Sequence, residues 1–354
     1  MANSNPRLAL QIVMVILAAL LFGAYILSGS RGISGVRPAP GAPAAGRSLQ
    51  AQLEERVMAV ADQARAYSRL SPDQLLKEIQ SNPRQFLRIL IVTGIGLFYT
   101  GVAAAGLFLL IWAGLRWRRG DVVLARQEGP TPQWRVWDAV VALAFLLLVS
   151  TAIGALFRPD NPYRVPLGSV PAQYLACLYA ARLVRERAGQ SVRALGLRAH
   201  QWARNILRGV LGYAAVYPIF IVLALLGQYA ARLMGEKFAG NPAAEFLFWT
   251  ESIPAALLII VSAGLLVPPA EEFLFRGVLY GALRQRLGVA WGIVASAAIF
   301  AVFHLNVYHF PAIFGLGVVL AFLYERTRTL VAPVVVHALF NTVNVVTIFL
   351  LSRI

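Results

Sequence analysis

Long apolar runs constrain this chain more than any other feature of its sequence. The runs are Leu8–Leu27, Phe86–Leu115, Asp138–Phe157, Leu167–Leu183, Ile206–Tyr229, Ile253–Leu283, Gly288–Phe303, Pro311–Tyr324 and Val331–Leu351. About 20 consecutive apolar residues make a helix long enough to cross a bilayer. Helices satisfy all their own backbone polar groups in lipid. The sequence therefore predicts an all-α, polytopic membrane helix bundle with about eight or nine transmembrane helices.

Composition and charge support a membrane location. The chain is 58% hydrophobic and 14% charged, a combination that soluble domains rarely show. Its net charge of +16 would suggest a nucleic-acid partner in a soluble protein, but the basic residues gather in short loops between apolar runs. Such loops are typically cytoplasmic. We therefore expect a multi-pass protein of the cytoplasmic membrane of a bacterium, with its N-terminus cytoplasmic, the lipid bilayer as a partner and no nucleic acid.

Changes in composition divide the chain into four segments. Residues 1–28 are predicted to be a signal anchor or a transmembrane helix. Residues 29–85 begin as a linker rich in Gly, Ala and Pro and continue as a helical segment outside the membrane. Within it, Ser71 and Gln74 have the spacing of a capping box. Residues 86–165 add further transmembrane helices, and residues 166–354 form the last segment.

Three charged side chains interrupt the apolar run that begins at Ile253. Glu271, Glu272 and Arg276 lie where each charge costs roughly 2.5–3.5 kcal/mol on insertion scales. Glu272 and Arg276 are four residues apart, so they share a helix face and can pair. Glu271 lies about 100° further round the helix and has no built-in partner. This makes Glu271 the candidate general base. The alternative is that both glutamates begin a helix after Pro269, where acidic residues favour the helix dipole.

Three more polar residues interrupt the later apolar runs. His304 follows one run, while His337 and Asn341 lie four residues apart in the last run and share a helix face. Each of them could simply be a hydrogen-bonding residue in helix packing. Straight helices would place His304 roughly 24 Å, Glu271 roughly 20 Å and His337 roughly 10 Å below the cytoplasmic ends. Their convergence therefore requires tilting or a break at Pro268-Pro269.

Together these residues suggest peptide-bond hydrolysis. Glu271, with His304 beside it, could deprotonate a water molecule that attacks a carbonyl carbon. His337 and Asn341 could donate hydrogen bonds to the oxyanion that forms. Other protease chemistries fit poorly, because the chain contains no His-Glu-x-x-His motif and no aspartate after Asp160.

Three alternatives remain open on the residues alone. Glu271, His304 and His337 are an acceptable ligand set for catalytic zinc, although we expect no cofactor because the histidines already have other roles. A transporter could use the same cluster to relay protons or ions, but the first half of the chain holds no second copy of the motifs. A non-catalytic immunity or scaffold protein could keep the cluster for binding alone.

The segment from about Pro166 to Leu351 resembles the CPBP family, which comprises the CAAX-protease and bacteriocin-processing (Abi) intramembrane endopeptidases. The family motifs Glu-Glu-x-x-x-Arg, Phe-x-x-x-His and His-x-x-x-Asn correspond to Glu271-Glu272 with Arg276, Phe300 with His304, and His337 with Asn341. The resemblance implies a glutamate-dependent endopeptidase similar to type II CAAX prenyl endopeptidases, whose substrate is a membrane-embedded or membrane-anchored protein or peptide. It also implies that Glu271 and His304 activate water, that His337 and Asn341 bind the oxyanion, and that Glu272 and Arg276 support them.

Overall fold

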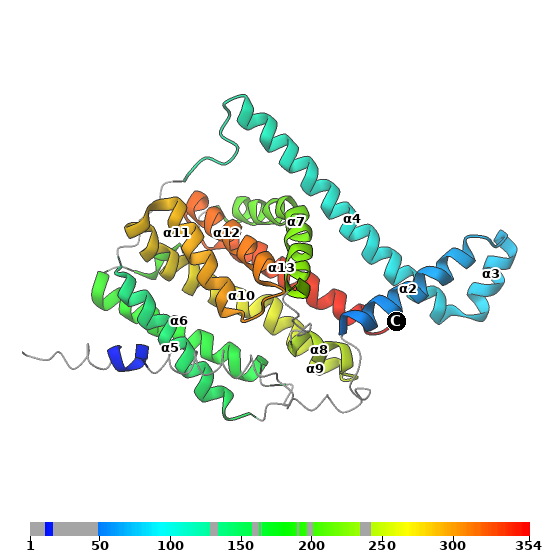
Figure 1. The fold of residues 1–354 in the computed structure, drawn as a ribbon, viewed down its shortest axis with the longest axis horizontal. Coiled ribbons are helices and arrows are strands. Elements are labelled where there is room, and N and C mark those ends of the chain that lie inside the picture. The colour runs from blue at the N-terminus through cyan, green and yellow to red at the C-terminus, as the bar shows by residue number, and fades with distance from the viewer. Residues whose placement is uncertain are drawn as a thin grey trace, which may run out of the picture.

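All secondary structure in the described part of the chain is helical. The computed structural model describes residues 11–16, 49–127, 134–157, 163, 165–189, 191–196, 201–233 and 242–354. The α-helices are α2 (Leu49–Tyr67), α3 (Pro72–Ser81), α4 (Pro83–Arg118), α5 (Val136–Gly154), α6 (Val170–Ala188), α7 (Trp202–Leu233), α8 (Pro242–Trp249), α9 (Ile253–Val261), α10 (Val267–Glu272), α11 (Gly281–Phe303), α12 (Phe310–Thr327) and α13 (Val331–Leu351). The short turns are η1 (Val165–Ser169), η2 (Val192–Leu195), η3 (Ser262–Leu266) and η4 (Phe273–Tyr280). The all-α prediction is confirmed (Figure 1).

Six helical stretches among the described residues are long and apolar enough to cross a membrane: α4, α5, most of α7, the stretch Ile253–Phe303, α12 and α13. Within Ile253–Phe303, Gly288 has a φ of 75° and marks a kink between the two spans expected there. The expected span Leu167–Leu183 is not among the six, because α6 places four charged residues in its last two turns. The expected span Leu8–Leu27 lies mostly outside the described residues. The predicted number of eight or nine spans is therefore not confirmed.

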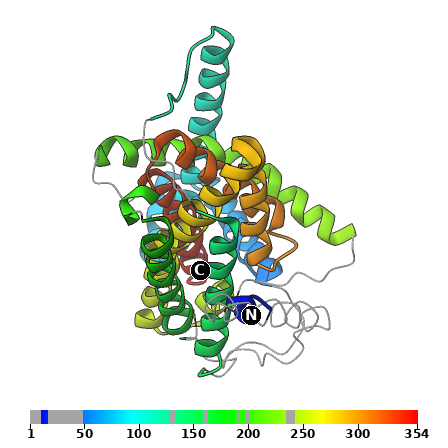
Figure 2. The same cartoon turned by 90° about the vertical axis from the view of Figure 1, so that its left-hand side faces the viewer.

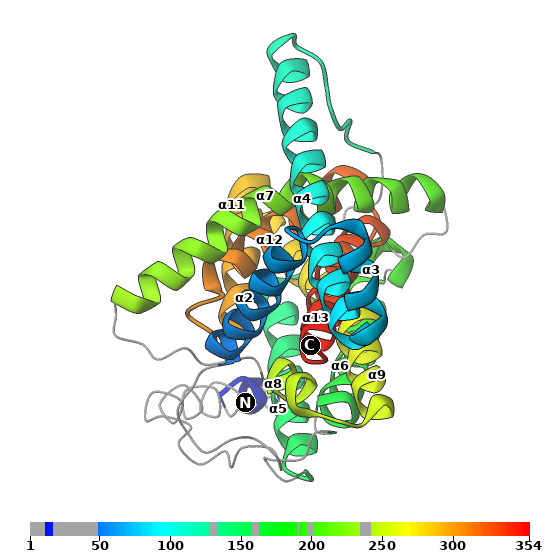
Figure 3. The ribbon, with the colours of Figure 1, turned by 90° about the vertical axis from the view of Figure 1, so that its right-hand side faces the viewer.

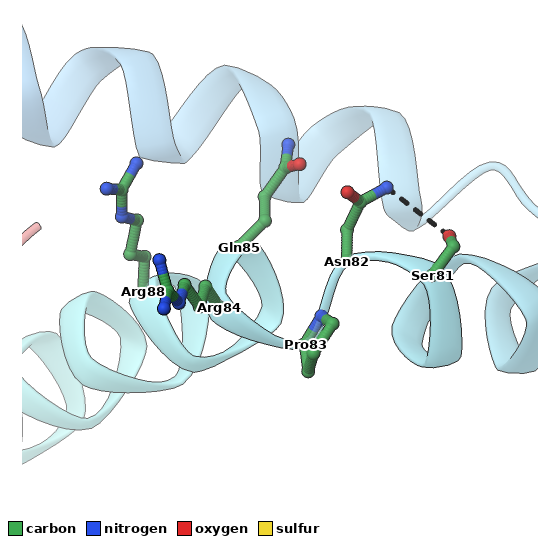
Figure 4. A pocket seen from close by; sticks show the side chains of 6 residues that line it. All are labelled: Ser81, Asn82, Pro83, Arg84, Gln85 and Arg88. Atoms are coloured by element: carbon green, nitrogen blue, oxygen red, sulfur yellow. Dashed lines mark hydrogen bonds between the residues drawn. The ribbon is translucent and has the colours of Figure 1, made fainter.

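The helices before residue 120 form an extension beside the main bundle (Figures 1 and 3). The predicted capping box opens α3, where the Ser71 backbone N–H donates to Gln74 Oε1 at 3.0 Å and the Gln74 N–H donates to Ser71 Oγ at 3.3 Å. A hollow lined by polar and basic residues marks the junction of α3 and α4, where Asn82 Nδ2 donates to Ser81 Oγ at 3.3 Å (Figure 4). The described part of residues 29–85 is thus helical up to this junction.

Helix α4 contacts the bundle along one side only. The Tyr99 hydroxyl hydrogen-bonds Thr347 Oγ1 of α13 at 2.8 Å, and the Tyr99 ring stacks on Tyr217 of α7 with centroids 5.5 Å apart. Gly106 lies against Ala214 and Pro218 of α7, where no side chain would fit. The remaining apolar side chains of α4 are largely exposed, as expected for a helix surrounded by lipid.

Helices α11, α12 and α13 form the centre of the bundle, and α5 and α6 lie together against η4 (Figures 1 and 2). Side chains of η4, α11 and α12 make up the buried core, including Leu274, Tyr280, Phe300, Leu316 and Leu320. This packing fixes the position of η4 and of the short helix α10 before it, which together contain the three charged residues of the Ile253 run.

Candidate active site

The two glutamates lie in the middle of a continuous helical path from α9 to η4. Because α9 begins at Ile253, neither Glu271 nor Glu272 is at a helix N-terminus, so the explanation through the helix dipole is wrong. The expected break at Pro268-Pro269 is also wrong. The backbone widens instead into the π-helical turn η3, and the helix continues.

The prolines explain why the helix widens. Pro268 has no backbone N–H, and its ring displaces the carbonyl four residues earlier. Val267 accordingly donates to Ser262 five residues back, which leaves the Ala263 carbonyl without its usual donor. Asn341 of α13 supplies the missing donor, because its Nδ2 donates to the Ala263 carbonyl at 2.9 Å. Asn341 therefore ties α13 to the widened turn.

Glu272 is fully buried and holds two partners. Its Oε1 lies 3.0 Å from Nη1 of Arg276, which confirms the predicted pair, and 2.8 Å from Nδ1 of His337. A carboxylate only accepts, so Nδ1 of His337 carries the hydrogen of this bond. In neutral His337 the other ring nitrogen, Nε2, is then an acceptor.

Glu271 has quite different surroundings. Its side chain is 14% exposed, and its Oε2 lies 3.7 Å from Nε2 of His337, too far for a hydrogen bond. Its Oε1 accepts from Nε2 of Gln173, at 3.2 Å, whereas its buried Oε2 has no hydrogen-bond partner. The carboxylate thus contacts one neutral donor and retains an unpaired oxygen.

The ring of Phe300 joins the histidines to the charged pair. It is fully buried and meets the rings of His304 and His337 edge to face, with centroids 4.7 and 5.7 Å apart. The guanidinium of Arg276 lies over the same ring, 4.2 Å from its centroid. Phe300 therefore contacts three of the predicted site residues.

His304 ends α11 and is an exposed residue. Its Nδ1 lies 2.8 Å from the Phe300 carbonyl, which can only accept, so Nδ1 carries the hydrogen and Nε2 is an acceptor in the neutral ring. Glu271 and His337 lie within electrostatic range of His304. The structure therefore brings Glu271, Glu272, Arg276, His304 and His337 together, despite the different depths expected for straight helices.

Two features of the site were not predicted. Asn341 contacts backbone of η3, and Gln173 of α6 contacts Glu271. The only signal for Gln173 was a lone amide inside an apolar run, which must find a polar partner in the protein interior. Among the described residues, no three His, Cys, Asp or Glu side chains are arranged to hold a metal ion.

Comparisons with known proteins agree with the geometry. Residues 253–343 match the family described as type II CAAX prenyl endopeptidase Rce1-like. The chain is 31% identical over 216 residues to the putative membrane peptidase YdiL of Bacillus subtilis, covering 59% of this chain and 83% of that protein. It is 29% identical over 140 residues to the membrane-embedded CAAX protease MroQ of Staphylococcus aureus, covering 37% and 53%. No solved structure matches. The chain therefore belongs to the CPBP family of CAAX-type membrane proteases and is an intramembrane endopeptidase.

Proposed function

We propose that this protease uses Glu271 as the general base that activates water. The observation that supports this role is the contrast between neighbouring carboxylates. Glu272 is paired with Arg276 and His337, whereas Glu271 contacts only a neutral amide and turns its unpaired Oε2 toward Nε2 of His337. A base must keep an oxygen able to take a proton, and only Glu271 does so.

In the proposed reaction, the oxygen of water attacks the carbonyl carbon of the substrate while its proton passes to Glu271. His304 assists, because Nε2 is the acceptor of its neutral ring and Glu271 is within electrostatic range. The new C–O bond turns the carbonyl oxygen into an oxyanion. The C–N bond then breaks, the leaving amine takes the proton, and the products are an acid and an amine.

His337 and Asn341 are the proposed oxyanion donors. With Nδ1–H directed to Glu272, His337 becomes a donor at Nε2 only after this nitrogen gains a proton. Glu271 Oε2, 3.7 Å away, is a source of that proton, and Glu272 then stabilises the imidazolium. Asn341 uses one amide N–H on the Ala263 carbonyl and has a second, which we assign to the oxyanion.

The proposed substrate is a membrane-embedded or membrane-anchored protein or peptide that is cut near its terminus. The CAAX description of the matching family and of MroQ supports this class, as does the lipid-exposed surface of the bundle. We propose the cytoplasmic membrane of a bacterium as the location, because both relatives are bacterial and the basic residues gather in short loops. We propose no cofactor.

The test compares membrane proteomes from cells that express the wild-type protein or Glu271→Gln, searching for a new chain terminus. We expect a terminus that forms only with the wild type. With purified proteins and a peptide that spans the cut, Glu271→Gln should be slower by about 10²–10⁴-fold, the usual contribution of general-base catalysis.

The matched control is Glu186→Gln, which neutralises an exposed glutamate at the end of α6 and should leave the rate unchanged. Undiminished cleavage by Glu271→Gln would show that Glu271 is not the base. Metal analysis and chelator treatment of the active protein test for zinc, and activity that is lost on chelation and restored by zinc would contradict a mechanism without metal.

A further inference from the structure

Gln173 lies in the wall of α6 that faces the active-site helix. Its Nε2 donates to Oε1 of Glu271, 3.2 Å away. The carboxylate can only accept, so this contact also fixes which end of the amide is nitrogen. We propose that Gln173 is a positioning residue that orients the Glu271 carboxylate for water activation, an inference that rests on the proposed function of Glu271.

Neighbouring contacts hold α6 in place without Gln173. The Tyr174 hydroxyl donates to the Leu266 carbonyl at 3.1 Å, and Cys177 Sγ lies 3.5 Å from the Ala270 carbonyl. Both reach only backbone on the opposing helical path. Gln173 is the member of this group that touches a side chain of the site, so its contact adds something other than helix packing.

The amide of Gln173 is poorly explained by stability. Its Oε1 is buried and has no hydrogen-bond partner, an arrangement that destabilises a folded protein. A leucine at this position would pack against the same helix without burying an unpaired acceptor. The cost of the glutamine is consistent with a function in the site.

The chemistry of an amide suits this function. The terminal torsion of a glutamate side chain is broad, so a hydrogen bond to Oε1 restricts the carboxylate plane and keeps Oε2 toward His337. An arginine or lysine here would orient the carboxylate too, but its charge would neutralise the base. The neutral amide orients Glu271 while leaving it basic.

The experiment compares Gln173→Leu, Gln173→Glu and Tyr174→Phe in the purified full-length protein. We expect Gln173→Leu to lower kcat by roughly ten- to hundred-fold, because misplacing a reacting group by about 1 Å can cost 10²-fold. KM and the unfolding temperature should be unchanged. The pH of half-maximal activity on the acidic side should rise, because a donor to the ionised carboxylate is lost.

Gln173→Glu keeps the size of the side chain and places two carboxylates together, so this acidic midpoint should rise further than in Gln173→Leu. Tyr174→Phe removes a hydrogen bond one residue away and should change neither kcat nor the pH profile. A loss of kcat matched by a lower unfolding temperature, with an unchanged pH profile, would assign Gln173 to packing and overturn the inference.

Glu271→Gln is measured in the same assay. If Glu271→Gln is inactive and Gln173→Leu retains full activity, the positioning role alone is overturned. If Glu271→Gln is active, the proposed function itself is overturned.

Discussion

At the scale of single residues, Arg276 holds the most demanding position in the site. It is buried between Glu272 and the face of Phe300, and so neutralises one carboxylate while supporting the ring that contacts both histidines. Arginine suits this position because its planar guanidinium can pair with a carboxylate and lie over an aromatic ring at once. The same residue therefore fixes Glu272 and Phe300.

Replacing Arg276 by Met should destabilise the protein by about 3–5 kcal/mol, because Glu272 would stay buried without a compensating charge. The double change Arg276→Met with Glu272→Met should recover much of the free energy of unfolding but no activity, since His337 loses its Nδ1 partner. Thermal unfolding in detergent and the cleavage assay measure the two effects separately.

The control pair is Arg182 and Glu186, which has the same four-residue spacing but is exposed, with the side chain of Arg182 72% accessible. Arg182→Met should change the unfolding temperature little, because exposed ion pairs are screened by solvent. Equal effects of Arg276→Met and Arg182→Met would mean that burial of Glu272 is not what makes Arg276 necessary.

Residues in the site differ in how well the sequence predicts them. The pair of Glu272 with Arg276 was predictable, because four-residue spacing places both on one helix face. The contacts of Glu272 with His337 and of Glu271 with Gln173 join residues 65 and 98 positions apart. Such contacts depend on how whole helices pack, which periodicity within one helix does not determine.

At the scale of elements, the turn η3 shows how a second helix changes the effect of a proline. Two adjacent prolines predict a break, since each removes a donor and displaces a carbonyl. The chain stays helical because the turn widens and Asn341 of α13 replaces one missing donor. The sequence of α9 to α10 alone contains no sign of this donor.

The close approach of α13 to η3 depends on Gly264. A Cβ atom at Gly264 would lie 2.3 Å from Thr342 Oγ1, 3.2 Å from Thr342 Cβ and 3.3 Å from Thr342 Cα. Rotation of the hydroxyl would relieve only the first contact, so α13 itself would have to move. Since α13 also contains His337 and Asn341, its position controls both proposed oxyanion donors.

Gly264→Ala should therefore destabilise the protein by about 1–3 kcal/mol, the usual cost of overpacking, and should lower activity as well. The matched control is Gly101→Ala in α4, where no atom lies within 4 Å of the added methyl group. This change should stabilise slightly, because alanine is favoured over glycine inside a helix. Equal unfolding temperatures for the two variants would show that α13 adapts to Gly264→Ala at no cost.

At the scale of the whole molecule, three basic segments converge on one buried carboxylate. Glu325 near the end of α12 accepts from Arg284 Nε at 2.8 Å, from Arg328 Nη2 at 2.9 Å and from the Tyr280 hydroxyl at 2.9 Å. Arg126, from the segment after α4, lies 3.3 Å from the same carboxylate. These basic segments were expected on one side of the membrane from charge alone, and their meeting at Glu325 places them at one end of the bundle.

The side of the membrane that this end faces is a prediction from loop charge, because Arg and Lys are enriched in cytoplasmic loops. It can be tested by labelling single cysteines in intact cells, after Cys177, the chain's one cysteine, has been replaced by Ala. Ser81→Cys, at the exposed junction of α3 and α4, should react with a membrane-impermeant maleimide. Val122→Cys, beyond the other end of α4 at a residue that is 69% exposed, should react only after the membrane is permeabilised. Reaction of Val122→Cys alone in intact cells would invert the orientation, and equal reaction of both would mean that α4 does not cross the bilayer.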